Sequence, residues 1–167
     1  GLSRELVIQG HDVDLILPKY DTIDTRHIRD FSVFYSGLKS YYAGEWYENT
    51  IWVGWVENFK VYFIESHHPR HFFDRGCVYG CEDDIERFLY FCRAAMEFLY
   101  KADLKADVIH LHDWQTAAIS ALYKEMYRPL GYQCSAIVFT IHNMEYQGKC
   151  AKNDLIQIGL KGEVDAY

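Results

Sequence analysis

Short apolar segments alternate in this chain with segments of helical periodicity, and this alternation restricts the possible folds more than any other feature. Residues 2–9 have the apolar spacing of an amphipathic helix, and Gly10 suits a left-handed helix end. An apolar run follows at residues 13–17 and stops at Pro18. A helix, a glycine and a short apolar strand in this order are typical of α/β folds, in which helices connect parallel strands.

The alternation returns in the second half of the chain. Residues 81–102 are expected to form the longest helix, with acidic residues in its first turn that complement the helix dipole. Apolar runs at 107–111 and 136–141 are expected to be buried strands, and residues 115–127 between them a helix. Residues 151–167 are expected to be loop with a short helix. The buried stripe of the long helix is predicted to consist of Ile85, Phe88, Leu89, Cys92, Ala95, Met96 and Leu99.

The middle of the chain has a different pattern. Residues 31–38 and 45–65 are rich in aromatic and β-branched side chains, which favour strands. The polar pairs at 48–49 and 57–58 interrupt these runs and are expected to be turns. The sequence therefore predicts a β-hairpin or meander inserted into the α/β unit.

Length, charge and cysteine content limit the function. A chain of 167 residues predicts one domain. Its formal net charge of −7 argues against partners such as nucleic acid or an anionic membrane. No apolar run is long enough to span a bilayer, and no signal-peptide pattern is present. The five cysteines show no repeated spacing, which indicates neither a zinc framework nor a disulfide scaffold and favours a reducing compartment.

Polar clusters follow three of the expected strands, at residues 19–21, 112–114 and 142–143. Ligands of open α/β sheets bind beyond the carboxyl ends of the strands. If the three strands are parallel, the clusters lie on one rim. The sequence therefore predicts a ligand site on this rim before any relative is considered.

The segment His110-Leu111-His112-Asp113-Trp114 allows several interpretations. His110 and His112 are two residues apart in a strand, so their side chains share a face, and His110 is expected to be a hydrogen-bonded core histidine. Asp113 can cap the following helix, contact a sugar, or do both. Trp114 can pack in the core or offer its ring to the apolar face of a sugar.

The pair His142-Asn143 has no evident packing purpose after an apolar strand. An imidazole exchanges protons near neutral pH, and an amide both donates to and accepts from a polyol. Gly148 allows a tight turn or a close approach of a ligand. The alternative is a turn that is merely polar.

Two other classes of function remain open from the residues alone. A metal-dependent hydrolase is conceivable with His110, His112 and Asp113 as ligands, although no completing ligand motif is present. The loop histidines at 67, 68 and 71 are expected to be solvated rather than bound to metal. A non-catalytic glucan-binding or assembly module is conceivable if three tryptophans of the β-ribbon are exposed, although such residues more often pack in a core. These are Trp46, Trp52 and Trp55.

Four segments, in this order along the chain, resemble one family. Residues 10–21, 73–80, 110–116 and 140–148 are similar to segments of bacterial glycogen synthases and plant starch synthases, which form glycosyltransferase family 5. The stretches 65–75 and 82–88 are most similar to soluble starch synthases of classes III and IV and their bacterial relatives. The resemblance covers nearly the whole chain.

The resemblance implies a GT-B architecture, in which two Rossmann-like domains with parallel sheets and helices on both faces oppose each other. Residues 1–167 would be part of the N-terminal, acceptor-side domain, without the C-terminal nucleotide-sugar domain. The family's Lys-x-Gly-Gly-Leu loop would precede Gly1. We therefore expect that the chain alone has no turnover.

The implied activity is transfer of glucose from ADP-glucose to the non-reducing end of an α-1,4-glucan, with retention of configuration. The expected partners are the glucan acceptor and the nucleotide sugar, with no metal and no other cofactor. The expected location is bacterial cytoplasm, or alternatively the plastid stroma. The preference for ADP-glucose over UDP-glucose and the oligomeric state stay open.

The resemblance also implies roles for single residues. His142 would contact the donor sugar and stabilise positive charge at its anomeric carbon, and Asp113 would bind sugar hydroxyls or orient its neighbours; these two are the expected catalytic residues. Tyr79, Trp114 and Asn143 would bind substrate.

Overall fold

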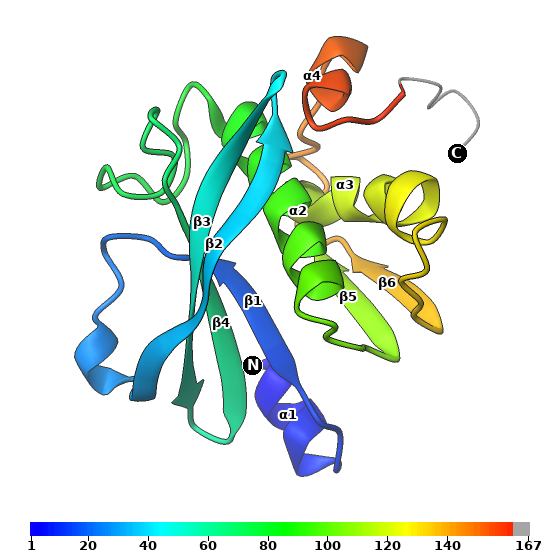
Figure 1. The fold of residues 1–167 in the computed structure, drawn as a ribbon. Helices are drawn as coiled ribbons and strands as arrows, with labels where there is room; N and C mark the ends of the chain where they lie inside the picture. Colours follow the sequence, from blue (N-terminus) through cyan, green and yellow to red (C-terminus); the bar gives the residue numbers. More distant parts are fainter. Residues whose placement is uncertain (162–167) are drawn as a thin grey trace. The chain divides into compact units, whose positions relative to one another are not determined.

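The computed structural model describes residues 1–161, which fall into two compact units. The first unit contains residues 1–38 and 48–80, and the second contains residues 39–47 and the chain from Cys81 onward. Figure 1 shows the helices and strands in sequence colours. Residues 162–167, which were expected to continue the C-terminal loop, lie outside the described residues.

The first unit is built on a four-stranded mixed sheet in the order β1-β4-β3-β2 (Figure 1). β1 and β4 are parallel, with Leu15 opposite Val61, whereas β3 and β4 are antiparallel, with Trp52 opposite Phe63. The expected insertion of a β-meander is thus confirmed. The elements are α1 (Leu2–Ile8), β1 (Asp14–Pro18), the 3-10 helix η1 (Thr25–His27), β2 (Arg29–Tyr42), β3 (Glu45–Val56) and β4 (Phe59–Ser66).

Only one of the two turns expected in the meander is present. Residues 57–58 connect β3 to β4, as predicted, but the turn expected at 48–49 is wrong. Asn49 is a fully buried residue of β3, and its Nδ2 donates to the carbonyl of Leu38 at 3.0 Å. The actual turn lies at Ala43-Gly44, where φ values of 52° and 89° supply the left-handed pair that suits a two-residue hairpin.

The second unit combines a two-stranded parallel sheet with three α-helices (Figure 1). β5 and β6 pair in register from Val108 opposite Ala136 to His112 opposite Thr140. α3 connects them and passes into a π-helical turn, η2, as far as Tyr127. Its elements are α2 (Asp84–Lys101), β5 (Val108–His112), α3 (Trp114–Leu122), η2 (Tyr123–Tyr127), β6 (Ala136–Thr140) and α4 (Lys152–Gln157). The prediction of a mixed α/β fold with parallel strands is confirmed.

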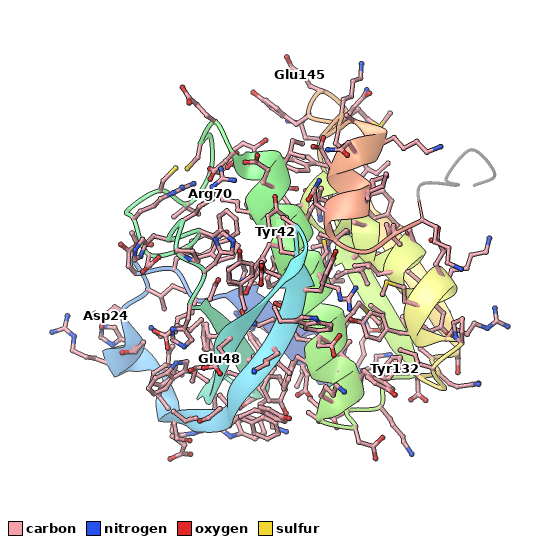
Figure 2. All side chains as sticks on the ribbon, turned by 45° about the horizontal axis from the view of Figure 1, so that its top comes forward. Asp24, Tyr42, Glu48, Arg70, Tyr132 and Glu145 are labelled. Carbon is pink, nitrogen blue, oxygen red and sulfur yellow. The ribbon has the colours of Figure 1, made fainter. Side chains whose placement is uncertain are left out.

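α2 is buried more completely than its apolar stripe predicts. Every residue from Arg87 to Phe98 is buried, including both arginines and Glu97. Each charged group has a partner: the guanidinium of Arg87 lies 2.8 Å from the Asp84 carboxylate, and that of Arg93 donates to the carbonyl of Ile158 at 2.9 Å. The tip of the β2–β3 hairpin, which carries Tyr42 (labelled in Figure 2), belongs to the same unit. The Tyr42 ring makes an edge contact with Tyr90 of α2, with centroids 5.9 Å apart.

Several strands are less buried than expected. Leu17 in β1 is 40% exposed, and Val138 and Phe139 in β6 are 42% and 45% exposed. Edge position does not account for this exposure, because β5 is equally an outer strand of its sheet and yet buries Ile109 and Leu111. An apolar run therefore predicts strand character correctly and the degree of burial incorrectly.

Three strands were expected to share one edge of a sheet, and only two of them, β5 and β6, do so. β5 and β6 pair with each other, whereas the strand at residues 14–18 pairs with β4 in a different sheet and a different unit. Apolar runs predict strands but carry no information about which strand pairs with which.

The cysteines also differ from expectation. Cys77 and Cys81 are disulfide-bonded, although their spacing suggested no disulfide scaffold. Cys92, Cys134 and Cys150 are free thiols, and burial raises the pKa of Cys92 to about 12. Glycines with positive φ at 76 and 80 give the 76–81 segment the backbone freedom that so short a separation requires. Within residues 1–161, no helix is both long enough and apolar enough to cross a bilayer.

Candidate active site

The polar residues that follow β5 and β6 lie side by side because these strands are parallel and in register. His112 is opposite Thr140, and the next backbone bond, from the amide of Asp113 to the carbonyl of Thr140, spans 2.9 Å. The residues after each strand therefore meet at one end of the two-stranded sheet. The predicted convergence of these two segments is confirmed, and ligand binding at this place stays a prediction.

Asp113 anchors the backbone that follows β6. Its Oδ1 accepts hydrogen bonds from the amides of His142 at 2.6 Å and Asn143 at 3.4 Å. The helix-capping role is wrong, because Asp113 precedes α3 without a side-chain cap bond. The carboxylate is directed toward the neighbouring strand end rather than along its own helix.

The backbone of Asp113 is strained. Its φ of 57° and ψ of 179° fall in a region that is almost restricted to glycine, at a cost of about 1–3 kcal/mol. The hydroxyl of Thr116 holds this turn, accepting from the amide of His112 at 2.7 Å and donating to the carbonyl of His112 at 2.9 Å. Such strain persists only where surrounding bonds enforce it, which is typical of functional positions.

Three imidazole rings form a stack at this strand end. The ring centroids of His110 and His112 are 4.3 Å apart, and those of His112 and His142 are 5.2 Å apart. His112 Nδ1 lies 3.0 Å from His142 Nε2. His110 Nε2 lies 2.7 Å from the hydroxyl of Thr140, so the prediction of a hydrogen-bonded, half-buried His110 is confirmed.

The charge state of His112 follows from its surroundings. Partial burial lowers the pKa of His112 most, and repulsion from His110 and His142 lowers it further, whereas Asp113 acts in the opposite direction. His112 is therefore neutral near pH 7, with one ring nitrogen as donor and the other as acceptor. The site thus combines a neutral imidazole, an exposed imidazole at His142 and a carboxylate.

Trp114 and Gly148 pack against each other. A Cβ atom on Gly148 would lie 2.2 Å from the Trp114 ring, and φ at this glycine is 58°. Trp114 also makes an edge contact with Phe88, with centroids 5.5 Å apart. The close approach predicted for Gly148 is therefore to the Trp114 ring. Both residues border an open, largely apolar pocket of about 460 Å³ between α2, α3 and the segment before α4.

Asn143 has a local structural role. Its side-chain oxygen accepts the amide of Glu145 at 2.9 Å, which closes a turn directly after His142. This bond and the two bonds from Asp113 hold the backbone on both sides of the His142 ring. A contact of Asn143 with substrate stays a prediction.

The remaining predicted residues belong to the first unit. The 19–21 cluster has structural partners there: Lys19 pairs with Glu65 at 3.0 Å, and the Asp21 carboxylate accepts the amide of Gly76 at 2.9 Å. Tyr79 lies in the segment after Gly76 and is 47% exposed. Its role in substrate binding stays a prediction.

The loop histidines have protein partners. His67 Nε2 is 2.8 Å from the Thr50 hydroxyl, and His71 Nδ1 is 2.9 Å from Asp74. His68 is buried rather than solvated: it stacks on Phe72, and burial lowers its pKa to about 4, with a smaller effect from Arg70. Nowhere in residues 1–161 do three or more His, Cys, Asp or Glu side chains converge as a metal-binding group. The hydrolase alternative therefore has no support here.

The tryptophans of β3 do not form one platform. Trp52 stacks on Phe31 with centroids 5.0 Å apart, and its indole donates to Glu65 at 2.7 Å. Trp55, three residues further along the strand, projects from the opposite face. Trp46 is 54% exposed but belongs to the second unit. The glucan-binding module therefore lacks the shared exposed face that it requires.

Sequence reasoning missed two residues of the site, Thr116 and Thr140. Both hydroxyls bind a backbone or ring group of the His110–His112 segment. Thr116 stands three residues after the helix-preceding Asp113, a position from which a side chain reaches back to the start of a helix. Thr140 could have been found only by aligning β5 with β6 in register.

Fold and site together define an α/β protein with a cluster of polar side chains beyond the carboxyl ends of two parallel strands, where open α/β sheets bind their ligands. The chain belongs to the starch synthase catalytic domain family, whose model matches residues 1–167. The predicted resemblance to glycogen and starch synthases is therefore confirmed.

Individual relatives agree with this assignment. A glycogen synthase of Protochlamydia amoebophila (strain UWE25) is 67% identical over 162 residues, which cover 97% of this chain and 32% of that protein. A probable chloroplastic or amyloplastic starch synthase 4 of Arabidopsis thaliana is 46% identical over 160 residues, covering 96% of this chain and 15% of that protein. The relatives thus include both a bacterial and a plastid protein.

A solved structure shows the same fold. The catalytic domain of starch synthase IV from Arabidopsis thaliana, bound to ADP and acarbose, superposes with a TM-score of 0.92 at 47% identity. The match covers 97% of this chain and 33% of that one. The architecture is accordingly part of a GT-B fold, and the chain spans about a third of the bacterial relative and of this catalytic domain.

Proposed function

We propose that this chain is part of a retaining glucosyltransferase that transfers glucose from ADP-glucose to the non-reducing end of an α-1,4-glucan. The observation that carries the proposal is the family match along all 167 residues, with 67% identity to a glycogen synthase. A related catalytic domain was solved with ADP, a nucleoside diphosphate, and acarbose, an oligosaccharide analogue. Both fit a nucleotide-sugar donor and a glucan acceptor.

His142 is the proposed contact to the donor sugar. Cleavage of a glycosidic or sugar–phosphate bond builds positive charge at the anomeric carbon, and preorganised dipoles stabilise such charge at little reorganisation cost. His142 is suited to this work because its ring is exposed while its backbone amide is bound to Asp113 at 2.6 Å. Its ring Nε2 lies 3.0 Å from His112 Nδ1.

Asp113 is proposed to act mainly by orienting His142. Its Oδ1 binds the two consecutive amides after β6, and a displacement of about 1 Å at a reacting centre can cost 10²-fold in rate. A direct contact of the carboxylate with sugar hydroxyls is compatible with this arrangement. Tyr79, Trp114 and Asn143 are proposed to bind substrate, and Trp114 borders the open apolar pocket.

No metal or other cofactor is proposed to take part. ADP-glucose is the proposed donor, and the chain by itself is proposed to lack turnover, because it spans about a third of its bacterial relative. A bacterial cytoplasmic location is proposed on the strength of that relative, with the plastid stroma as the alternative suggested by the plant protein.

The test uses the full-length protein that contains this chain. Its activity is measured with ADP-glucose, and in parallel with UDP-glucose, on a maltooligosaccharide acceptor. We expect elongation of the glucan, inhibition by free ADP, and a fall in kcat of about 10²-fold or more for His142→Ala. Absence of elongation with either donor would refute the activity, and an unchanged kcat in His142→Ala would refute the catalytic role of this residue.

A further inference from the structure

His112 is the central member of the imidazole stack and has no role in the proposed function so far. It lies at the last position of β5, and its backbone amide and carbonyl are both bound by the Thr116 hydroxyl. Its ring lies between those of His110 and His142, inclined by 26° and 18° to them. The backbone of His112 is therefore held by hydrogen bonds, and its ring contacts a neighbouring imidazole on either side.

The contact between His112 and His142 restricts where their protons reside. The 3.0 Å separation of His112 Nδ1 and His142 Nε2 accommodates a single proton, so one nitrogen donates and the other accepts. The tautomer of one ring therefore determines the tautomer of the other. Histidines that bind metals commonly have a hydrogen-bond partner on their other ring nitrogen, and that partner sets the orientation and the tautomer of the ring.

We propose that His112 is a positioning residue that holds the His142 ring in one orientation and one tautomer, by accepting the Nε2–H of His142 at Nδ1. This inference rests on the proposed role of His142. In this tautomer Nδ1 of His142 carries a lone pair, which is the polarity required next to developing positive charge on a sugar.

The charged and titratable groups around His112 support a neutral ring, which is the state that the proposed bond requires. They are His110 on the same strand, Asp113 before α3 and His142 after β6. Burial together with the two neighbouring imidazoles lowers the pKa of His112, and the opposing effect of Asp113 is the smallest of the four. A neutral His112 retains a lone pair for the bond, whereas a protonated ring could only donate.

The structure provides a matched control within the stack. His110 also contacts the His112 ring, but its Nε2 bonds to the hydroxyl of Thr140. Removal of the His110 ring therefore disturbs the packing of His112 without removing the bond to His142. Asparagine serves as the conservative replacement at 112, because its amide group lies close to the position of an imidazole Nδ1 and can accept the same proton.

The experiment compares His112→Ala, His112→Asn, His110→Asn and His142→Ala in the full-length enzyme, with kcat and KM for ADP-glucose measured separately. We expect His112→Ala to lower kcat about 10- to 100-fold with KM changed less than about threefold, in line with other ring-orienting partners. His112→Asn should recover most of this loss, and His110→Asn should leave kcat within about twofold of the wild type. Selective ¹⁵N-histidine labelling should show the Nε2–H tautomer of His142 in the wild type and a mixture in His112→Ala, and a wild-type His142 with its proton on Nδ1 would overturn the proposed direction of the bond.

The outcomes separate the two claims. If His142→Ala lowers kcat but His112→Ala does not, or if His110→Asn lowers it equally, the positioning role is overturned and the proposed function stands. Two equally populated tautomers of His142 in the wild type would overturn the role even if His112→Ala fails to fold. An unchanged kcat in His142→Ala would overturn the catalytic assignment of that residue and this inference with it.

Discussion

The second unit contains two polar clusters, one partly exposed and one buried. The strand-end cluster of His112, Asp113 and His142 is partly exposed, and its hydrogen bonds orient groups that still face solvent. The cluster of Arg93 and Glu97 is 5% exposed at each residue and lies inside the unit. There, Tyr127 donates to Glu97 at 2.6 Å, and Arg93 faces the same carboxylate at 3.5 Å.

The difference shows which polar groups serve stability and which serve function. A buried carboxylate is stable only with its partners, so each bond of the inner cluster contributes to folding. The strand-end cluster instead includes a strained backbone at Asp113. This strain lowers the stability of the fold, and it places the Asp113 carboxylate where it binds the backbone amide of His142. Substitutions in the strand-end cluster should therefore affect catalysis, and substitutions in the inner cluster should affect folding.

The largest effect is expected from Asp113→Gly, compared with Asp103→Gly. Both aspartates have positive φ, 57° and 51°, so glycine relieves the backbone at each. Only Asp113 binds the amides of His142 and Asn143. We expect kcat of the full-length enzyme to fall about 10²-fold in Asp113→Gly and to be unchanged in Asp103→Gly. Equal activity of the two variants would contradict the orienting role.

The next largest effect is expected from Glu97→Ala. This change leaves the buried guanidinium of Arg93 without its carboxylate, and loss of one partner of a buried pair costs about 3–5 kcal/mol. The apparent Tm of the protein should fall by about 6–20 °C, while kcat at low temperature is retained.

The control for Glu97→Ala is Arg26→Ala, which breaks the exposed pair of Arg26 with Asp24. It should leave Tm unchanged within measurement, because exposed pairs contribute little. A similar fall of Tm in both variants would contradict the distinction between buried and exposed charges.

A smaller effect is expected from Gly148→Ala, measured against Gly131→Ala. Both glycines have positive φ, 58° and 99°, so each substitution strains the backbone. Only at Gly148 would the new methyl group meet the Trp114 ring, at 2.2 Å, whereas Gly131 has open space around it. Overpacking costs about 1–3 kcal/mol, so Gly148→Ala should be less stable than Gly131→Ala by about that free energy and should have the lower apparent Tm. Equal Tm values would show that the Trp114 ring moves away freely.

The last effect is a gradual change with pH and concerns the buried imidazole of His68, which contrasts with the exposed ring of His142. His68 Nδ1 accepts the amide of Arg70 at 3.2 Å, and the folded ring has a pKa of about 4 instead of 6.5. Between these values the unfolded chain binds one proton more than the folded chain, so stability rises with pH. The gain is at most about 1.4 kcal/mol per pH unit.

The measurement is the apparent Tm from pH 4 to pH 6.5 for the wild type and His68→Gln. The wild type should gain more with rising pH than the variant, which has no titrating group at this position. Parallel curves would show that His68 is protonated in the folded protein.

Much of the candidate site could be predicted from local sequence. The segments 110–114 and 140–148 point to strand ends, because apolar runs are followed there by polar residues. The pairing of β5 with β6 confirms that the two segments meet. The role of Asp113 could not be predicted, since a residue before a helix is expected to cap it, and only the neighbouring strand offers the amides of His142 and Asn143.

Other errors have the same origin. The polar pair at 48–49 suggested a turn, but Asn49 lies within β3, and its side-chain amide donates a hydrogen bond to the carbonyl of Leu38 in β2. The glucan-binding alternative required Trp46, Trp52 and Trp55 on one exposed face, but side chains alternate along a strand, so Trp52 and Trp55 project from opposite faces of β3. Each error concerns a partner distant in the sequence, which no local pattern reports.

The sequence by itself determined the strands and helices, the α/β class, the glycine positions that need positive φ, and the two motifs at the strand ends. These follow from short-range sterics and apolar periodicity, which a few neighbouring residues establish. Only the tertiary structure decided that the strand at 14–18 pairs with β4, that Asp113 holds the backbone of His142, and that His112 lies between two imidazoles. These depend on strand register, in which a shift of one residue moves every side chain to the other face.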